Sequence, residues 1–391
     1  MIDYDKILNK KVKAIKPSGI RRFFDLASDM EGVISLGVGE PDFKTPYAIR
    51  NSAIQTLQAG KTWYTANAGL PELKKEICSY LSRRFDLSYE PKDQVIVTVG
   101  GSEAIDLCIR SVIEEGDEII IPEPSFVCYD PIARLCGGKV VPLETRAEDG
   151  FRITPNALKS LITDKTKLLI FPFPNNPTGA IMEKSDLEEI AKVLKDTNIL
   201  VLSDEIYAEL TYEKNHVSIA SIDEMRERTI VVGGFSKAFA MTGWRLGYAC
   251  GPKEIMKEML KVHQFAIMCA PTTSQYSAIT ALRECQEATD EMRAEFNMRR
   301  KLIVDGFNQM GLRCFSPEGA FYVFPSIKST GLSSEEFCEK LLFSKKVAVV
   351  PGTAFGECGE GYVRVSYSYS ISHITTALKR IEEFLAELKQ N

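Results

Sequence analysis

The chain has 391 residues, of which 45% are hydrophobic and 26% charged, and its formal net charge at pH 7 is −5. Its length exceeds what one small core can bury, so we expect two domains. The acidic balance offers no basic surface for nucleic acid, and the longest uncharged stretch, 264–282, contains Pro, Gln, Thr and Ser, which argues against a membrane span.

The first 45 residues read as an N-terminal arm with part of a small domain. A basic amphipathic piece leads to a short helix expected over 20–29, and ISLGVG at 34–39 is typical of a strand. A helix is then expected from Pro46 to Gly60, because proline suits the first helical position and glycine suits the end. An exposed aromatic turn at 63–65 precedes the next helix, which opens at Pro71.

Residues 46–284 alternate short β-rich runs with helical stretches, such as 103–113 and 185–194. Buried strands separated by helices predict an α/β fold, in which a large domain holds a mostly parallel seven-stranded sheet flanked by helices. The seven expected strands are 95–99, 118–121, 139–143, 167–171, 199–203, 229–232 and 246–250.

The alternation of strands and helices ends after Pro271. A long charged helical stretch over about 284–310 leads to GAFYVFPSI, VAVVPG and YVRVSYS, three strands with a helix among them, and then to a terminal amphipathic helix. We therefore expect residues 285–391 to form a smaller α+β domain.

Cysteine and histidine usage argues against metal and disulfide chemistry. The ten cysteines are never closer than eight residues, and the three histidines are scattered. Zinc sites and disulfide scaffolds both require tighter spacing, so we expect no metal site and reduced cysteines in a cytoplasmic protein. With so few histidines, lysine becomes the better candidate for acid–base chemistry.

Residues suited to ligand binding follow several of the expected strands. Gly100-Gly101-Ser102 opens a helix, where free N–H groups would bind a phosphate, although such a sequence is often only a turn. Phe126 could stack on a planar ring or simply pack in the core. Asn176, held extended before a proline, could donate to a ligand oxygen.

Three further groups follow the next two strands. Asp204 ends a buried strand, where a carboxylate is costly unless it pairs with a cation. Lys237 follows an apolar strand, and a partly desolvated amine can lose its proton near neutral pH and attack a carbonyl; an ordinary surface lysine is the alternative. Arg245 suits phosphate or carboxylate.

The carboxyl ends of parallel strands meet at one edge of a sheet, so these groups are expected to lie together. A phosphate cradle, a stacking aromatic, a buried carboxylate and an amine are what a phosphorylated, cationic, planar aldehyde cofactor requires. The residues alone therefore indicate a site for such a cofactor.

Seven motifs in order extend this interpretation: SLGVGEPDF at 35–43, YTANAG at 64–69, TVGGSEA at 98–104, NPTG at 176–179, SDEIY at 203–207, FSKAFAMTGWRLGY at 235–248 and YVRVS at 362–366. Through them the chain resembles the class I/II (fold type I) pyridoxal-phosphate aminotransferases over nearly its whole length. It looks most like the bacterial branch of aspartate, aromatic and acetyl-diaminopimelate aminotransferases.

The resemblance implies transamination between an L-amino acid and a 2-oxo acid, with 2-oxoglutarate the expected acceptor, in a ping-pong reaction. Lys237 would hold pyridoxal 5′-phosphate as a Schiff base in the large domain and shuttle a proton. The cofactor-binding residues implied are Gly101, Ser102, Glu103, Phe126, Asn176, Asp204, Tyr207, Ser236, Lys237, Arg245 and Tyr64. Those implied for substrate binding are Gly39, Asn176 and Arg364.

The resemblance also implies individual roles. Asp204 would pair with the ring nitrogen, Tyr207 and Asn176 would donate to the ring phenolate, and Phe126 would stack on the ring. The backbone at 101–102 would hold the phosphate together with Arg245.

Substrate contacts are implied for the second domain and the arm. Arg364 would take the substrate α-carboxylate, and Gly39 would let that carboxylate approach the backbone. Side-chain recognition would fall to the arm around Ile20 to Phe23, to residues near Tyr64 and to the partner's 264–274 segment. Because Tyr64 would complete the neighbouring subunit's phosphate site, a homodimer is implied.

Two positions depart from the family pattern. Many relatives carry a serine three places before the lysine, where this chain has Gly234, so one phosphate hydrogen bond would be lost or replaced by a backbone N–H. The stacking position is Phe126, where others carry Tyr or Trp. Two alternatives keep the cofactor: a β-eliminating carbon–sulfur lyase, and a non-catalytic regulator that binds the cofactor without turnover.

Overall fold

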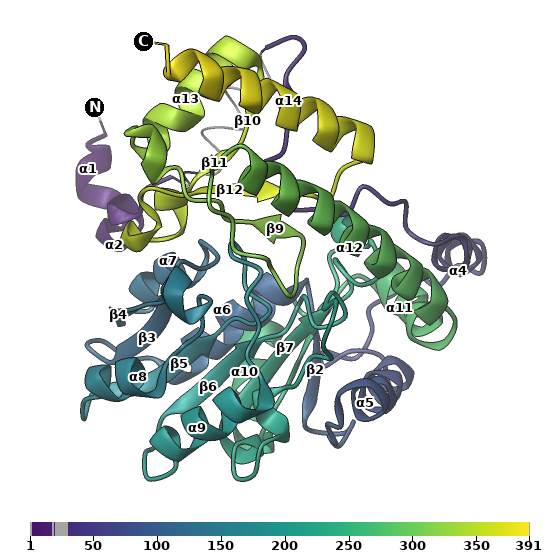
Figure 1. Ribbon diagram of the computed structural model, residues 1–391. Helices are drawn as coiled ribbons and strands as arrows, with labels where there is room; N and C mark the ends of the chain where they lie inside the picture. The colour runs from purple at the N-terminus through teal and green to yellow at the C-terminus, as the bar shows by residue number, and fades with distance from the viewer. Residues whose placement is uncertain (1, 18, 20–29, 391) are drawn as a thin grey trace.

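A computed structural model describes residues 2–17, 19 and 30–390, so the helix expected over 20–29 lies outside the described residues (Figure 1). None of the helices in the described ranges combines the length and apolar character needed to cross a bilayer. Ten cysteines are present and all are free thiols, each buried or partly buried.

A seven-stranded sheet forms the centre of the larger part of the molecule, with strand order β2-β8-β7-β6-β5-β3-β4. All neighbours pair in parallel except β8, which is antiparallel to both β2 and β7. This confirms the predicted α/β class and mostly parallel sheet. The strands are β2 (Val95–Thr98), β3 (Glu118–Glu123), β4 (Lys139–Glu144), β5 (Thr166–Phe171), β6 (Leu200–Asp204), β7 (Thr229–Gly234) and β8 (Gly247–Cys250).

The sheet is buried on both faces, as its β5 strand shows. Leu168 and Ile170 pack in one core cluster, whereas the intervening Leu169 and the following Phe171 pack in another. Successive side chains of a strand point to opposite faces, so continuous apolar runs are what a sheet covered by helices on two sides requires. The first cluster includes buried residues of helix α6 and the second includes those of α9.

Helices cover this sheet (Figure 1). Helix α10 packs against α6, and α11 packs against both α4 and α5. The helices of this part are α4 (Tyr47–Gln58), α5 (Pro71–Phe85), α6 (Gly101–Val112), α7 (Tyr129–Leu135), α8 (Pro155–Leu161), α9 (Lys184–Leu194), α10 (Lys253–Ala266) and α11 (Thr272–Glu284).

The remaining elements surround a separate core cluster and two small sheets. Antiparallel β11-β12-β9 makes one sheet, and β1 pairs in parallel with β10 to make the other. Strand β1 is only Ile34–Ser35, shorter than the strand predicted over 34–39. The other elements are α12 (Gln286–Gln309), β9 (Tyr322–Val323), α13 (Ser334–Lys345), β10 (Val347–Ala348), β11 (Val350–Pro351), β12 (Val363–Ser366) and α14 (Ile371–Leu388). The division at residues 45/46 and 284/285 remains our proposal.

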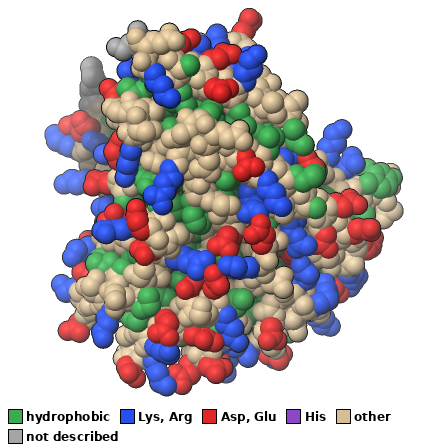
Figure 2. Space-filling view, in the orientation of Figure 1, with side chains coloured by type: hydrophobic (Ala, Val, Ile, Leu, Met, Phe, Trp, Pro, Cys, Tyr) green, Lys and Arg blue, Asp and Glu red, His purple; other side chains and the backbone are tan. Residues whose placement is uncertain are grey.

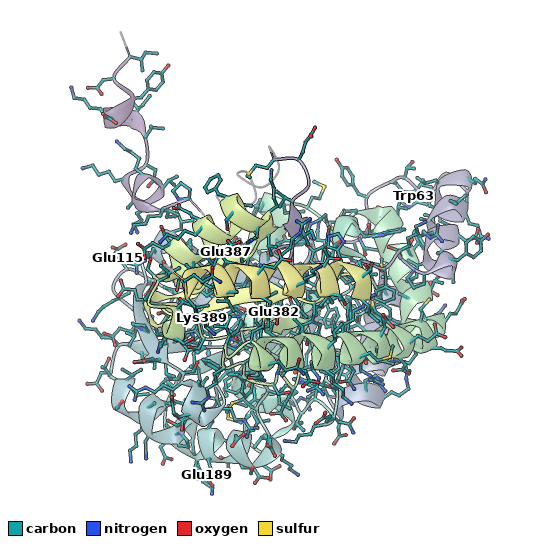
Figure 3. The ribbon with its side chains drawn as sticks, turned by 45° about the horizontal axis from the view of Figure 1, so that its top comes forward. Trp63, Glu115, Glu189, Glu382, Glu387 and Lys389 are labelled. Atoms are coloured by element: carbon teal, nitrogen blue, oxygen red, sulfur yellow. The ribbon has the colours of Figure 1, made fainter. Side chains whose placement is uncertain are left out.

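The N-terminal arm extends outward from the rest of the chain and touches it where residues 10–14 pack against α7 (Figure 3). Its helices α1 (Tyr4–Ile7) and α2 (Lys10–Ala14) bury none of their residues, and Lys11 forms an ion pair with Glu115 at 2.6 Å. Elsewhere, acidic and basic side chains intermingle over the face seen in Figure 2.

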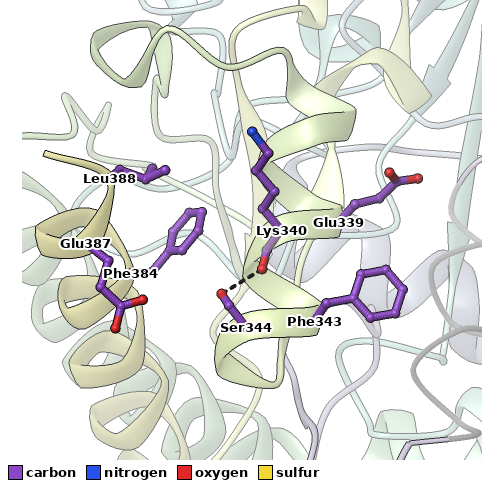
Figure 4. Close-up of a pocket in the computed structure, with 7 residues that line it drawn as sticks. All are labelled: Glu339, Lys340, Phe343, Ser344, Phe384, Glu387 and Leu388. Atoms are coloured by element: carbon purple, nitrogen blue, oxygen red, sulfur yellow. Dashed lines mark hydrogen bonds between the residues drawn. The ribbon is translucent and has the colours of Figure 1, made fainter. Parts of the chain in front are cut away.

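An open groove lies between α13 and α14, with a volume of about 580 Å³ (Figure 4). None of the candidate site residues contributes to its lining, which consists of Glu339, Lys340, Phe343, Ser344, Phe384, Glu387 and Leu388.

Candidate active site

Lys237 lies just beyond β7, in the turn that follows Gly234. Its partly buried ammonium group donates a hydrogen bond to the carbonyl of Gly39 and lies 5.8 Å from the ring centre of Tyr207. Burial is the main cause that lowers the pKa of Lys237 to about 8; the carboxylate of Glu40 opposes this lowering and the cation of Arg364 contributes to it. The sequence prediction of a desolvated amine therefore agrees with its surroundings.

Asp204, the last residue of β6, is 7% exposed. Its Oδ2 accepts a hydrogen bond from the Tyr129 hydroxyl at 2.7 Å, and its Oδ1 accepts one from the Ile206 backbone at 3.2 Å. Burial raises the pKa of Asp204 above its usual value. Because none of the described cations forms an ion pair with it, this is a buried carboxylate whose geometry favours a cationic ligand.

Arg364, on β12, is 2% exposed and forms no ion pair with any carboxylate in the described part of the chain. Its Nη1 donates to Asn176 Oδ1 at 3.0 Å and its Nη2 donates to the Gly37 carbonyl, while Nε has no hydrogen-bond partner. Burial lowers the pKa of this guanidinium group. A buried cation of this kind is suited to a ligand carboxylate.

Arg245 approaches the turn at which β2 leads into α6, the turn predicted to bind a phosphate. Gly100 has a φ of +81°, and a Cβ there would lie 2.8 Å from Arg245 Nη2, so the guanidinium group sits at the helix N-terminus. A Cβ on Gly247 would lie 2.7 Å from the Gly101 nitrogen, so β8 also packs closely against this turn. Free N–H groups, the helix dipole and an arginine together favour a phosphate. Ser102 is exposed at this position.

Glu103 occupies the first turn of α6, but its side chain is already engaged. Its Oε2 accepts a hydrogen bond from the Val99 backbone at 2.5 Å, and its Oε1 lies 2.7 Å from Nδ1 of the fully buried His263. The carboxylate thus braces the turn that precedes the helix, and a contact with the cofactor remains a prediction.

Three other predicted residues lie in or next to this site. The Tyr207 hydroxyl lies 2.8 Å from the Tyr322 hydroxyl. Phe126 is partly buried and packs edge-on against Tyr129, with ring centres 6.1 Å apart. Ser236 is buried beside Lys237.

The predicted partner-facing residue lies on an exposed apolar surface. Tyr64 is 76% exposed, and Trp63, Phe265 and Met268 are exposed as well. Two hydrogen bonds tie these segments together, from Thr272 to the Trp63 carbonyl and from Asn67 to the Met268 carbonyl. The arm residues around 20–23, predicted to recognise the substrate side chain, lie outside the described residues.

Sequence reasoning missed Tyr129 and Tyr322. Tyr129 begins α7, three residues after Phe126, and Tyr322 lies in the GAFYVF strand. Two signals in the sequence could have indicated these residues. One tyrosine lies in the first turn after a strand end, and the other lies in a strand opposite the YVRVS motif. Neither signal shows which hydroxyl a side chain will contact.

Comparisons with known proteins agree with this geometry. The family model for aminotransferase class I and II matches residues 31–381. The aspartate aminotransferase of Pyrococcus abyssi is 45% identical over 98% of this chain and 99% of that protein. The chain belongs to the class I and II aminotransferases.

Other members of this aminotransferase family are similarly close. Aromatic-amino-acid aminotransferase 2 of Thermococcus litoralis is 44% identical over 98% of this chain and 99% of its own length. The structure of Thermus thermophilus aspartate aminotransferase with maleate matches with a TM-score of 0.92 and 38% identity, covering 96% of this chain and 99% of that one. This protein is therefore an enzyme that performs pyridoxal-phosphate-dependent transamination.

The residues present fit pyridoxal phosphate. Asp204 is a buried carboxylate that pairs with no cation of the described residues, which suits a protonated ring nitrogen. The glycine turn that opens α6 lets the Arg245 guanidinium group approach the helix N-terminus, where its charge would complement a phosphate. Lys237 would supply the amine that the aldehyde requires.

Proposed function

We propose that this aminotransferase acts on an L-amino acid whose α-carboxylate binds Arg364, with 2-oxoglutarate as the amino acceptor. One observation carries the proposal: Arg364 donates to the Gly37 carbonyl and Lys237 donates to the Gly39 carbonyl. The two cations are therefore held by the same three-residue segment. A substrate anchored on the first presents its Cα near the second.

Pyridoxal phosphate supplies an electron-withdrawing ring that stabilises negative charge at the substrate Cα. Asp204 would hold the ring nitrogen, and Tyr207 and Asn176 would donate to the ring oxygen. The Asn176 amide is oriented for this, because its Oδ1 is occupied by Arg364 and its Nδ2 remains available. Arg245 and the N-terminus of α6 would hold the phosphate, with Gly101, Ser102, Glu103 and Ser236 around them.

Lys237 would move the proton. With a pKa of about 8, about a tenth of the amine is unprotonated at pH 7. Its Nζ can then take a proton from the substrate Cα and deliver it again on the same face. The ring centres of Tyr207 and Phe321 lie 5.8 and 5.6 Å from the amine, and burial of the amine is the main cause of its lowered pKa.

The donor proposed is aspartate or an aromatic amino acid. Relatives of comparable identity carry both names, and the Thermus structure contains maleate, a dicarboxylate. We would mix the enzyme with single amino acids and follow the absorbance of the bound cofactor in one turnover. Aspartate, glutamate and the aromatic amino acids should react fastest, and 2-oxoglutarate should reverse the change. The proposal would be contradicted if aspartate, glutamate and the aromatic amino acids reacted more slowly than lysine or alanine.

Lys237→Ala tests the central residue, with Lys75→Ala on the exposed face of α5 as the control. The first variant should lose turnover by a factor of about 10⁴ or more and lose the visible absorbance of the cofactor, because the amine is removed. The second should match the natural protein. Unchanged absorbance and turnover in the first variant would refute the assignment.

We also propose a homodimer in which Tyr64 reaches the partner's phosphate site. Its exposure, and the apolar surface around it, support this arrangement. Chains carrying Lys237→Ala and chains carrying Tyr64→Ala would be unfolded together, refolded and assayed. If the tyrosine acts across the interface, mixed dimers contain one complete site and regain up to about a quarter of natural activity. A dimer in which both chains carry Tyr64→Ala together with Lys237→Ala provides the inactive control. If mixing the single variants restores no activity, the shared site is refuted.

A further inference from the structure

Tyr322 is placed between the two parts of the site that the proposed function assigns to cofactor and substrate. It is 1% exposed and lies on β9, directly opposite Ser366 of β12. Arg364 lies two residues before Ser366 on the same strand, so its side chain leaves the same face. Consequently the tyrosine ring and the guanidinium group are neighbours, with 4.6 Å between the Arg364 Cζ and the ring centre.

The hydroxyl of Tyr322 points at the other part of the site. It lies 2.8 Å from the Tyr207 hydroxyl, and the two rings meet edge to face at 5.9 Å. The same hydroxyl approaches Gly39 so closely that a Cβ at that position would overlap it. One side chain therefore contacts a residue proposed for the cofactor, one proposed for the substrate, and the backbone segment that bonds Lys237.

The number of available protons fixes the direction of the hydrogen bond between the hydroxyls of Tyr207 and Tyr322. Each hydroxyl has a single proton. If Tyr207 gives its proton to the ring oxygen of the cofactor, the bond between the hydroxyls must be donated by Tyr322. A donor that itself accepts a hydrogen bond is polarised and becomes stronger.

Arg364 favours that direction. Burial raises the pKa of both hydroxyls, and the guanidinium cation opposes this rise most directly at Tyr322, whose ring it contacts. The hydroxyl on the ring that contacts the cation is therefore the better donor. A carboxylate bound to Arg364 would offset the cation and weaken the effect.

We propose that Tyr322 is a positioning residue that couples carboxylate binding at Arg364 to the hydrogen-bond donor strength of Tyr207. The inference rests on the proposed function, because it takes the roles of those two residues from it. Asn176 gives a second connection, since its Oδ1 accepts from Arg364. Loss of Tyr322 should therefore reduce the coupling without abolishing it.

The test uses the holoenzyme without amino acid and follows the visible absorbance of the bound cofactor as a function of pH. Tyr322→Phe removes only the hydroxyl and should raise the midpoint of the titration by about 0.3 pH unit or more. Tyr367→Phe is the matched control, because that buried hydroxyl bonds the Ala320 carbonyl at 3.0 Å and the Tyr212 hydroxyl at 3.2 Å, and neither residue is proposed to bind cofactor or substrate. Its midpoint should equal that of the natural protein.

A second titration adds maleate, a dicarboxylate that cannot react. Maleate should raise the midpoint in the natural protein, and the rise should fall by about half or more in Tyr322→Phe. Tyr322→Leu also removes the ring beside Arg364, so it should raise KM about fivefold, whereas Tyr322→Phe should leave KM within about twofold.

The outcomes separate the two proposals. If Tyr322→Phe titrates like the natural protein with and without maleate, Tyr322 is only a packing residue and the inference is wrong. If the natural protein has no pH-dependent absorbance, or maleate leaves its midpoint unchanged, the roles proposed for Lys237 or Arg364 fail first. Circular dichroism of each variant distinguishes misfolding from either result.

Discussion

Lys237 should make the cofactor-free protein less stable than a version in which an apolar side chain replaces it. Its ammonium group is desolvated, and the difference between the ordinary pKa of 10.5 and about 8 corresponds to about 3.4 kcal/mol, at about 1.36 kcal/mol per pKa unit. Lys237→Met keeps the length of the side chain and removes the charge. The hydrogen bond to the Gly39 carbonyl is lost, which costs about 1 kcal/mol. A net gain of about 2 kcal/mol at pH 7 is expected.

The pH dependence follows from the sign of the pKa change. Between about pH 8 and pH 10.5 the unfolded state binds more protons at this lysine than the folded state, so its penalty shrinks as the pH rises. The penalty falls from about 3.3 kcal/mol at pH 7 to about 1.4 kcal/mol at pH 9.5. The advantage of Lys237→Met should therefore fall by about 2 kcal/mol across that range.

Urea unfolding of the cofactor-free proteins, followed by fluorescence at pH 7 and about pH 9.5, measures both quantities. Lys75→Met, at an exposed position of α5, controls for the loss of a positive charge in general. Equal or lower stability of Lys237→Met at pH 7, or a gain that does not change with pH, would show that the amine is not desolvated as described.

Three other substitutions are informative. Arg364→Lys keeps the charge but loses the planar fork, so kcat/KM should fall about 10- to 100-fold, mainly through KM, in steady-state assays; an unchanged KM would place the carboxylate elsewhere. Gly234→Ser would put a Cβ 2.6 Å from Ile206 Cδ1, with only a void of about 10 Å³ adjoining, so it should cost about 1–3 kcal/mol in urea unfolding. Ile206→Val removes that methyl group. The double variant should therefore be at least about 1 kcal/mol more stable than the summed losses of the two single variants predict, and a loss equal to that sum would exclude the clash. Tyr129→Phe should destabilise the cofactor-free protein by about 1–3 kcal/mol, because Asp204 loses one of its two hydrogen bonds, and equal unfolding midpoints would contradict that view.

The sheet was predictable because its strands are continuous apolar runs between recognisable helix boundaries. The strand expected over 167–171 is β5 with one more residue, and the strand expected over 118–121 extends by two. Strand β1 was predicted too long, since the ladder with the two-residue β10 ends where the Leu36 N–H bonds the Ala348 carbonyl. Hydropathy cannot show whether an extended segment pairs with another strand or binds side chains through its backbone carbonyls. The Gly37 carbonyl accepts a hydrogen bond from Arg364, and the Gly39 carbonyl accepts one from Lys237.

Some residues of the candidate site could be predicted from the sequence, and others could not. Asp204 and Lys237 could be placed together because the ends of neighbouring parallel strands must meet. Tyr322 could not, because its contacts depend on how a strand of the second sheet packs over the first. Glu103 illustrates a related limit: its sequence position adjoins the anion site, yet its carboxylate bonds Val99 and His263, a partner distant in sequence.

The position of β2 at the edge of the sheet affects how the predicted phosphate cradle is assembled. Its one neighbour among the described strands is β8, so residues 95–98 must wait for residues 247–250 before they join the sheet. A growing chain that has just added Lys237 already contains Asp204 and the amine, but not the strand that packs Gly247 against the cradle. The turn predicted to bind the phosphate is therefore completed by residues that are synthesised after both Asp204 and Lys237.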